Sequence, residues 1–343
     1  MDNLFSDAVE RLFAQSVTPS VIRAIEAGGS PDELWQAFEA SGFLDVLIPE
    51  EHDGAGLALS DAFSLLMFAG QYAVPLPFAH TMLARAWLSG AGVAIPPGAI
   101  VIAGSPIVRN GTELDSDAVP FGRVADWLLA DSETGAILLP VTAAQRQPCA
   151  HHGSVAASLH WDACPPNAVS INYAAPSGAS LTQIAAAGYA TLLAGAAARV
   201  LELTLDYANQ RNQFGKPIGK FQAVQNQISV MAERAWAARM AAQLACQGTG
   251  PFPRPLLAAV GKSTASEASC LIADIGHAVH GAIGVTEEYD LQLYTRRLRE
   301  WRLAAGSESY WASHIGSALL SKKGESALAF ICNDLSAPCD MAG

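Results

Sequence analysis

The residues best suited to chemistry lie in two glycine-containing segments of the C-terminal half. The first segment, Arg211–Gln222, combines an arginine, two glycines and a terminal glutamine. A guanidinium group can bind two phosphate oxygens at once, so a turn that presents Arg211 beside glycines is suited to a pyrophosphate. A loop between helices that carries one exposed arginine can also be an ordinary solvated turn, and this alternative stays open.

The second segment, residues 278–290, contains Gly281 and Gly284 ahead of two glutamates. Glycine ends helices and lets another molecule come close to the backbone. The same residues would equally serve as a helix end and an interhelical turn. By itself, this segment therefore leaves a binding role and a structural role open.

The composition excludes several classes of protein. The 343 residues include 20 Lys and Arg against 32 Asp and Glu, a formal net charge of −12. Binding of nucleic acid needs a basic surface, so no nucleic-acid partner is expected. Only 15% of the residues are charged, below the ~25% of an average soluble domain. This low charge indicates that other subunits cover part of the surface.

Neither a metal site nor a membrane segment is expected. The six cysteines form no C-x-x-C pair and fit a reduced, cytoplasmic protein with buried thiols. The first residues lack the basic and apolar pattern of a signal sequence. The run Ile184–Ala198 is mostly alanine and glycine and continues into Arg199, which favours a closely packed helix over a membrane span.

Helices must position both segments, because the residues around them have helical spacing. Two predicted helix faces consist of Leu193, Ala197, Val200 and Leu201, and of Val224, Ile228, Met231 and Ala235. Residues 1–96 also indicate helices: Ser30 and Glu33 form a capping box around Pro31, and Ser60 opens a further helix. A glycine-rich loop lies between them at residues 48–56.

Residues 97–178 have a different pattern. Short apolar runs at 99–103, 127–130 and 136–141 are separated by Gly, Asp, Asn and Pro, which predicts the short strands of a small β domain. We therefore predict a mostly α, α+β protein. It has a helical domain at residues 1–96, a β domain at 97–178 and a helical bundle at 179–343.

At this spacing and in this domain order, the motifs resemble those of the acyl-CoA dehydrogenase family. Residues 47–56 look like its N-terminal PEEYGG-G loop, Arg211–Gln222 like its R-x-x-F-G-K…Q flavin-nucleotide motif, and residues 278–290 like its Q-x-x-G-G-x-G…E-(Y/H) motif. The resemblance covers nearly the whole chain. It implies the fold of that family with a C-terminal four-helix bundle, and a tetramer that binds FAD at a subunit interface.

The resemblance also implies a reaction. Family members remove the α-proton of an acyl-CoA with a glutamate, while a hydride from the β-carbon passes to the flavin and then, as electrons, to an electron-transferring flavoprotein. A thioester α-proton is weakly acidic. The base must therefore be shielded from water, and the enolate oxygen must receive hydrogen bonds.

This chain departs from the family at the catalytic base. The usual base sits in a Y-E-G-T turn that matches residues 304–307, and Ala305 stands at the glutamate position. A minority of members carry the base near the start of the long helix that precedes the R-x-x-F-G motif, where this chain has Ala185. Alanine cannot accept a proton, so no catalytic residue is assigned at either position.

Glu308 is a candidate replacement, because it lies three residues after Ala305. However, an acid just behind the predicted N-cap residue Ser307 is also what the helix dipole favours. Glu287 and Glu288 are expected to be first-turn charges of another helix for the same reason.

The β domain departs as well. Most members carry a T-E-P-x-x-G-S-D segment around the flavin ring, whereas residues 101–111 read VIAGSPIVRNG. Alanines at positions 278 and 282 also replace the usual glutamine and second glycine of the last motif. The contacts to the nucleotide end of FAD are better preserved. For them the resemblance assigns Arg211, Phe214, Gln222 and Gly281, and it adds Ser307 as a further cofactor-binding residue.

The leading hypothesis is a non-catalytic subunit of a heteromeric acyl-CoA dehydrogenase, similar to the bacterial α2β2 enzymes that act on sterol side chains. A paralogous subunit would supply the base, the flavin-ring contacts and the acyl pocket. Arg211 would pair with the pyrophosphate, Phe214 and Gln222 would line the nucleotide, and Gly281 would let the backbone approach it.

Three alternatives stay open. The chain could be a self-sufficient homo-oligomeric dehydrogenase with Glu308 as a displaced base. It could also be a flavin-dependent monooxygenase of the same fold. The third alternative is a non-enzymatic scaffold subunit that holds no FAD, against which the preserved Arg211–Gln222 motif argues.

Overall fold

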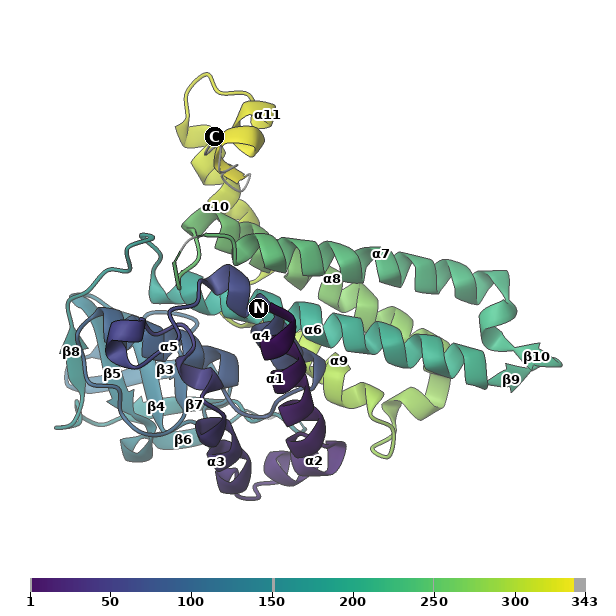
Figure 1. The fold of residues 1–343 in the computed structure, drawn as a ribbon, viewed down its shortest axis with the longest axis horizontal. Coiled ribbons are helices and arrows are strands. Elements are labelled where there is room, and N and C mark those ends of the chain that lie inside the picture. Colours follow the sequence, from purple (N-terminus) through teal and green to yellow (C-terminus); the bar gives the residue numbers. More distant parts are fainter. Residues whose placement is uncertain (1, 150–151, 249, 336–343) are drawn as a thin grey trace.

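The computed structural model describes residues 2–149, 152–248 and 250–335. A bundle of long helices runs the length of the molecule, and the N-terminal helices and a small β domain lie beside one end of it (Figure 1). The helices of the N-terminal part are α1 (Asp2–Ser16), α2 (Pro19–Glu26), α3 (Asp32–Ser41), α4 (Leu59–Gln71) and α5 (Phe78–Gly90).

Two predicted helix starts differ from the structure. The capping box at Ser30 is wrong, because Pro31 is itself the N-cap residue with helix-like angles (φ −83°, ψ −4°) and no side chain caps the first turn. The Ser30 hydroxyl instead accepts a hydrogen bond of 3.1 Å from the N–H group of Asp32. The helix predicted to open at Ser60 begins at Leu59, whose N–H group donates to the carbonyl oxygen of Gly250.

Eight of the described strands form two four-stranded sheets in the middle of the chain. The first has the order β1-β4-β5-β8, in which β1 and β4 are parallel and the other pairs are antiparallel. Its strands are β1 (Ile100–Ile102), β4 (Trp127–Ser132), β5 (Gly135–Pro140) and β8 (Val169–Ile171). The second sheet is antiparallel with the order β2-β3-β7-β6. It consists of β2 (Val108–Asn110), β3 (Glu113–Val119), β7 (Ala157–Trp161) and β6 (Gln145–Pro148).

The C-terminal part is a bundle of α6 (Leu181–Gln210), α7 (Gln222–Ala245), α8 (Pro255–His280) and α9 (Leu291–Leu303), followed by α10 (Glu308–Ser321) and α11 (Ala327–Phe330). A capping box starts α6. The Ser180 hydroxyl accepts from the N–H group of Gln183, and the side-chain oxygen of Gln183 accepts from the N–H group of Ser180. By length and composition, α6 and residues 255–285 could each cross a membrane. Since 83% of the apolar window in α6 is buried inside the fold, this helix is part of the core.

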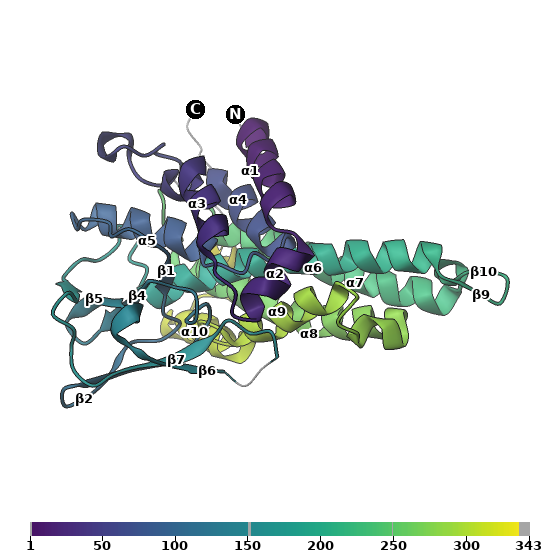
Figure 2. The same cartoon turned by 90° about the horizontal axis from the view of Figure 1, so that it is seen from below.

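The two ends of the bundle have different surroundings. The β domain and the N-terminal helices surround one end, where α6 begins and α9 ends. At the other end, α6 and α7 are joined by a short hairpin of β9 (Asn212–Gln213) and β10 (Lys216–Pro217), which projects from the molecule (Figures 1 and 2). The two ends therefore offer two separate candidate sites.

Candidate functional site

The structure brings four of the five predicted cofactor-binding residues to the projecting end of the bundle. Arg211 is the C-cap residue of α6, and its N–H group donates to the carbonyl oxygen of Tyr207 at 2.8 Å. The Tyr207 ring stacks on that of His280 at the end of α8, with 4.4 Å between centroids and 22° between planes. This stack ties the end of α6 to the end of α8, so Arg211 and Gly281 share one end of the bundle. We call the group of Arg211, Phe214, Gln222 and Gly281 the bundle tip.

Phe214 is the most unusual residue of the bundle tip, because 92% of it is exposed. It sits in the hairpin turn with φ 53°, and the Phe221 ring lies perpendicular to its ring, with 6.2 Å between centroids. Lys216 lies over that same Phe221 ring at 4.4 Å. An aromatic side chain held out in water is typical of a contact to another molecule.

Gly281 gives the bundle tip a backbone surface that other residues could not provide. It has φ 64° and ψ −143°, a region essentially limited to glycine, and it ends α8 as predicted. A Cβ atom at this position would meet nothing within 4 Å. The backbone is therefore open to an approaching ligand.

Ser307 lies elsewhere. It is the N-cap residue of α10, at the β-domain end of the bundle, and its hydroxyl accepts from the N–H group of Tyr310 at 3.4 Å. The structure thus separates Ser307 from the bundle tip within one chain. A single dinucleotide could contact both places only if they belonged to different subunits.

The turn at the family's base position is closely packed on one side. Ala305 is 4% exposed, and its carbonyl oxygen accepts a hydrogen bond of 2.7 Å from the Trp311 indole. The loop after β1 packs directly on this turn, because a Cβ atom on Gly104 would lie 2.6 Å from the Ala305 nitrogen. The position therefore has no acid, although Gly104 and the Ala305 turn also line a pocket of about 650 Å³.

A buried lysine fixes the same turn. Lys262 of α8 is fully buried, and its Nζ donates to the carbonyl oxygens of Arg302 at 2.7 Å and Gly306 at 2.9 Å. Its third contact is the Ser266 hydroxyl at 2.7 Å. Burial lowers the pKa of the Lys262 ammonium to about 7. Because the Ser266 hydroxyl can donate as well as accept, the network satisfies both the charged and the neutral amine.

The alternative base position lies within the packed core. Ala185 is 0% exposed in the first turns of α6. One turn further along, the Tyr189 ring lies 4.4 Å from that of His80 of α5. Burial lowers the pKa of His80 to about 3, so this imidazole is neutral at physiological pH. Neither it nor Ala185 is open to a substrate.

Glu308 is held by an ion pair. It lies in the first turn of α10, directly after the N-cap residue Ser307, as predicted, and its Oε2 accepts from the Nε of Arg302 at 3.0 Å. Burial raises the pKa of the Glu308 carboxyl, but the hydrogen bonds from Arg302 outweigh this effect and hold the pKa below its usual value. A paired carboxylate with a lowered pKa is a poor base.

The prediction that Glu287 and Glu288 lie in the first turn of a helix is wrong. Both residues lie in the turn before α9, which begins only at Leu291. Glu287 pairs there with His152, at 3.1 Å between Oε1 and Nε2. Its carbonyl oxygen accepts a hydrogen bond from Arg23 of α2. The long-range contact to α2 holds this turn out of the helix.

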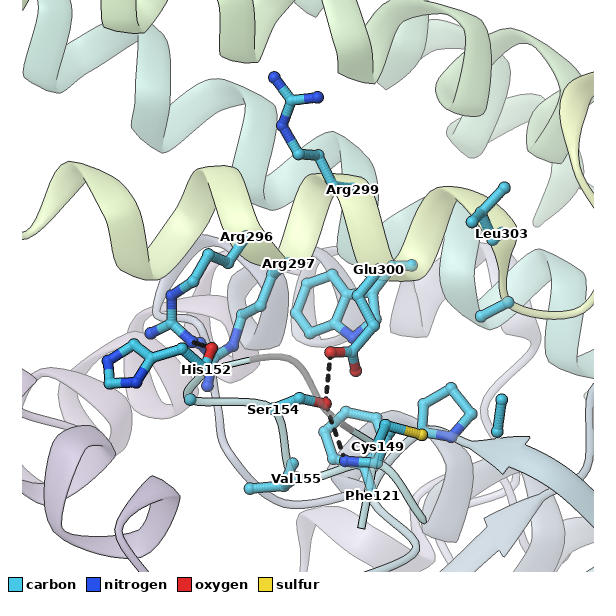
Figure 3. A pocket seen from close by; sticks show the side chains of 16 residues that line it. Phe121, Cys149, His152, Ser154, Val155, Arg296, Arg297, Arg299, Glu300 and Leu303 are labelled. Carbon is cyan, nitrogen blue, oxygen red and sulfur yellow. Dashed lines mark hydrogen bonds between the residues drawn. The ribbon is translucent and has the colours of Figure 1, made fainter. Parts of the chain in front are cut away.

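A pocket of about 600 Å³ lies between α9 and the segments 118–121 and 153–156 of the β domain (Figure 3). We call it the α9 pocket. Glu300 points from α9 towards Ser154, whose hydroxyl donates to Oε2 of Glu300 at 2.7 Å. Sequence reasoning missed Glu300 and Ser154, because they are 146 residues apart and match no motif. It also missed Lys262, for which an isolated lysine within an apolar helix was the only available signal.

Comparison with known proteins decides the family. The acyl-CoA dehydrogenase N-terminal domain matches residues 2–115, and the acyl-CoA dehydrogenase C-terminal domain matches residues 181–320. Acyl-CoA dehydrogenase IpdE2 of Mycobacterium tuberculosis is 33% identical over 300 residues, which cover 86% of this chain and 89% of that protein. The chain belongs to the acyl-CoA dehydrogenase family. The predicted family and fold class are thereby confirmed.

Solved structures show the same fold. The ChsE4-ChsE5 complex from Mycobacterium tuberculosis superposes with a TM-score of 0.81 at 20% identity, covering 94% of this chain and 97% of that chain. A glutaryl-CoA dehydrogenase from Mycobacterium smegmatis in complex with FADH2 superposes with a TM-score of 0.71 at 19% identity. The match covers 94% of this chain and 95% of that chain. Dehydrogenases of this fold are thus flavoproteins, in agreement with the predicted cofactor.

Proposed function

We propose that this acyl-CoA dehydrogenase family member is the non-catalytic subunit of a heteromeric enzyme. A paralogous catalytic subunit holds the acyl-CoA, the base and the flavin ring. This chain lends its bundle tip to the nucleotide end of that subunit's FAD. The two chains together carry out α,β-dehydrogenation of an acyl-CoA thioester.

The missing carboxylate at Ala305 carries this proposal. Alanine has no proton acceptor, and Gly104 packs against the Ala305 backbone. Ala185 is equally buried and equally unreactive. With Glu308 held by Arg302, no described carboxylate at the family's base positions is free to remove an α-proton.

The bundle tip fits a dinucleotide. Arg211 provides a fork for a pyrophosphate, the exposed Phe214 ring provides an apolar face, and Gly281 leaves its backbone uncovered. Gln222 starts α7, where it is exposed and can donate or accept hydrogen bonds. When bound, FAD supplies the hydride acceptor for the β-carbon of the acyl group. The residues of the bundle tip only bind and orient it.

The position of the bundle tip supports a site shared between chains. It lies at the opposite end of the bundle from the turn at Ala305 (Figures 1 and 2). A cofactor gripped by Arg211 and Phe214 would therefore place its reactive ring in a neighbouring chain. The ChsE4-ChsE5 neighbour is named as a complex of two different proteins, which favours a heteromer over a homo-oligomer.

The rival functions fit less well. A homo-oligomer with Glu308 as base would have to break the Arg302 ion pair before each proton transfer. A monooxygenase needs no base but does need contacts to the flavin ring, and the loop after β1 packs on Ala305 instead. A scaffold without FAD would have no use for an exposed Phe214 beside Arg211.

Further partners follow from the proposed reaction. An electron-transferring flavoprotein would reoxidise the shared flavin, and neither nucleic acid nor a membrane takes part. We propose a cytoplasmic location, since the cysteines in the described part of the chain are free thiols. These are Cys149, Cys164, Cys246, Cys270 and Cys332. Cys339 lies outside the described residues.

The test is the FAD content of the complex purified with its paralogous partner. Arg211→Ala should lower the FAD bound per complex by about ten-fold or more, because it removes a charge-assisted contact to the pyrophosphate. Arg239→Ala is the matched control, since Arg239 is exposed on α7 and its guanidinium lies 5.2 Å from the Trp236 ring. Full FAD occupancy in the Arg211 variant would contradict the proposed site.

A further inference from the structure

We propose that the α9 pocket binds a neutral, mainly apolar molecule that carries a hydroxyl group, with Glu300 as the acceptor for that hydroxyl. This inference goes beyond the proposed function. It concerns a cavity that is remote from the bundle tip and needs neither FAD nor the partner subunit.

The body of the pocket is suited to an apolar molecule. Its volume of about 600 Å³ lies in the ~300–1,000 Å³ range of small-molecule sites. The aromatic rings of Phe121 and Trp301 form part of the lining, with 6.3 Å between their centroids, and both side chains are almost fully buried. Val155 and Ala156 add further apolar lining. Two or three fused saturated rings would fill such a space.

One polar group in this lining is fixed in place. Ser154 is 6% exposed, and its oxygen accepts a hydrogen bond of 3.0 Å from the N–H group of Ala156. Its hydroxyl proton is therefore directed to Oε2 of Glu300 at 2.7 Å (Figure 3). Among the described residues, no hydrogen bond reaches the second oxygen of Glu300, Oε1. This oxygen is an oriented acceptor beside an apolar cavity.

The arginines around the pocket are not free to bind an anion. Arg296 donates to the side chains of Gln292 and Glu26 and to the carbonyl oxygen of His152, at 2.6, 2.8 and 2.7 Å. Arg297 donates to the other oxygen of Glu26 at 2.8 Å. An anionic ligand would find these guanidinium groups occupied and would be repelled by Glu300.

A cationic ligand is disfavoured as well. Arg296 and Arg297 precede Glu300 on the same helix and line the same pocket. A third guanidinium, that of Arg299, points away from Glu300 and pairs with Asp274 at 2.7 Å. Because Arg296 and Arg297 share the one carboxylate of Glu26, their cluster keeps an excess of positive charge, which disfavours a cation beside Glu300. The class of ligand that remains is an uncharged hydrogen-bond donor on an apolar body, of which an alcohol is the simplest.

The test uses two probes of nearly equal size, decahydro-2-naphthol and its methyl ether, with the full chain. Ligand-observed NMR titration should give at least about ten-fold tighter binding of the alcohol, because only the alcohol can donate to the carboxylate. Glu300→Met should abolish this preference, and Glu300→Gln should restore part of it. The matched control is Glu233→Met, at an exposed position of α7.

Two results with the wild-type chain would overturn the proposal. One is equal binding of the alcohol and the ether to the wild-type chain, and the other is no binding of either probe at millimolar concentration. The wild-type comparison holds even if Glu300→Met fails to fold. The variant Ala156→Phe tests where the alcohol binds, because the new phenylalanine ring would fill the α9 pocket. Binding of the alcohol unchanged by Ala156→Phe would place the ligand elsewhere and contradict the assignment.

Discussion

Gly104 and Ala305 are packed backbone to backbone across the boundary between the β domain and the helical bundle. A Cβ atom on Gly104 would lie 2.6 Å from the Ala305 nitrogen and 3.0 Å from its Cα atom. Two segments that are distant in the sequence thus meet at the place where other family members keep their base. The proposed lack of catalysis in this chain comes from the missing carboxylate at this place.

This contact predicts a specific loss of stability. Gly104→Ala should lower the free energy of unfolding by about 1–3 kcal/mol, because the new methyl group has no room beside the Ala305 backbone. Urea denaturation followed by circular dichroism measures the change. Gly316→Ala is the control: it lies within α10 with open space around its Cβ position, so it should stabilise the protein by up to about 1 kcal/mol. Equal stability of Gly104→Ala and the wild type would show that the two segments do not touch.

Lys262 predicts a pH dependence. Burial lowers its pKa from 10.5 to about 7, so between about pH 7 and pH 10 the unfolded chain binds more protons than the folded one. The free energy of unfolding gains a contribution that rises with pH over this range. In Lys262→Met this contribution is absent. The stability difference between wild type and variant should therefore be larger at pH 9 than at pH 7, as measured by urea denaturation at both pH values.

An equal stability difference at both pH values would mean that Lys262 stays charged throughout the range. Arg254→Met is not a suitable control, since the Arg254 guanidinium donates to the carbonyl oxygen of Asp334. Lys323→Met is suitable, because Lys323 is exposed after α10, and its stability difference from wild type should be the same at both pH values.

Glu26 joins the N-terminal helices to the bundle. Its two carboxylate oxygens accept from Arg296 and Arg297 at 2.8 Å each, and its side chain is only 6% exposed. Glu26→Gln should cost about 3–5 kcal/mol, because it leaves buried guanidinium charge without its partner. The exposed pair of Glu267 and Arg234, 3.8 Å apart, offers the comparison. Glu267→Gln should change the stability by less than about 1 kcal/mol, and a similar loss in both variants would contradict the role of Glu26.

How much the sequence could predict depends on the range of the interactions. The strands β1, β4 and β5 are apolar runs, and the sequence indicates all three. The neighbouring sheet is different, because every residue of β2 (Val108–Asn110) is exposed and β6 (Gln145–Pro148) is exposed throughout. Such strands have no apolar pattern of their own, and only pairing with β3 and β7 defines them.

The candidate sites follow the same rule. The motif at residues 211–222 is continuous, so its residues could be named from the sequence. The contact of Ser154 with Glu300 and that of Lys262 with Gly306 join residues 146 and 44 positions apart. Local spacing carries no information on such pairs. For this reason both the packing of the Ala305 turn and the α9 pocket became visible only in the fold.

The most direct test of the central claim is the visible absorption spectrum of this chain, together with its native mass. Both are measured on the chain purified alone and on the chain co-expressed with its paralogous dehydrogenase. The account predicts a colourless protein alone and a yellow complex with one FAD per pair of chains. A yellow protein with one FAD per chain, formed without any partner, would show that the flavin site is complete within this sequence and would contradict the account.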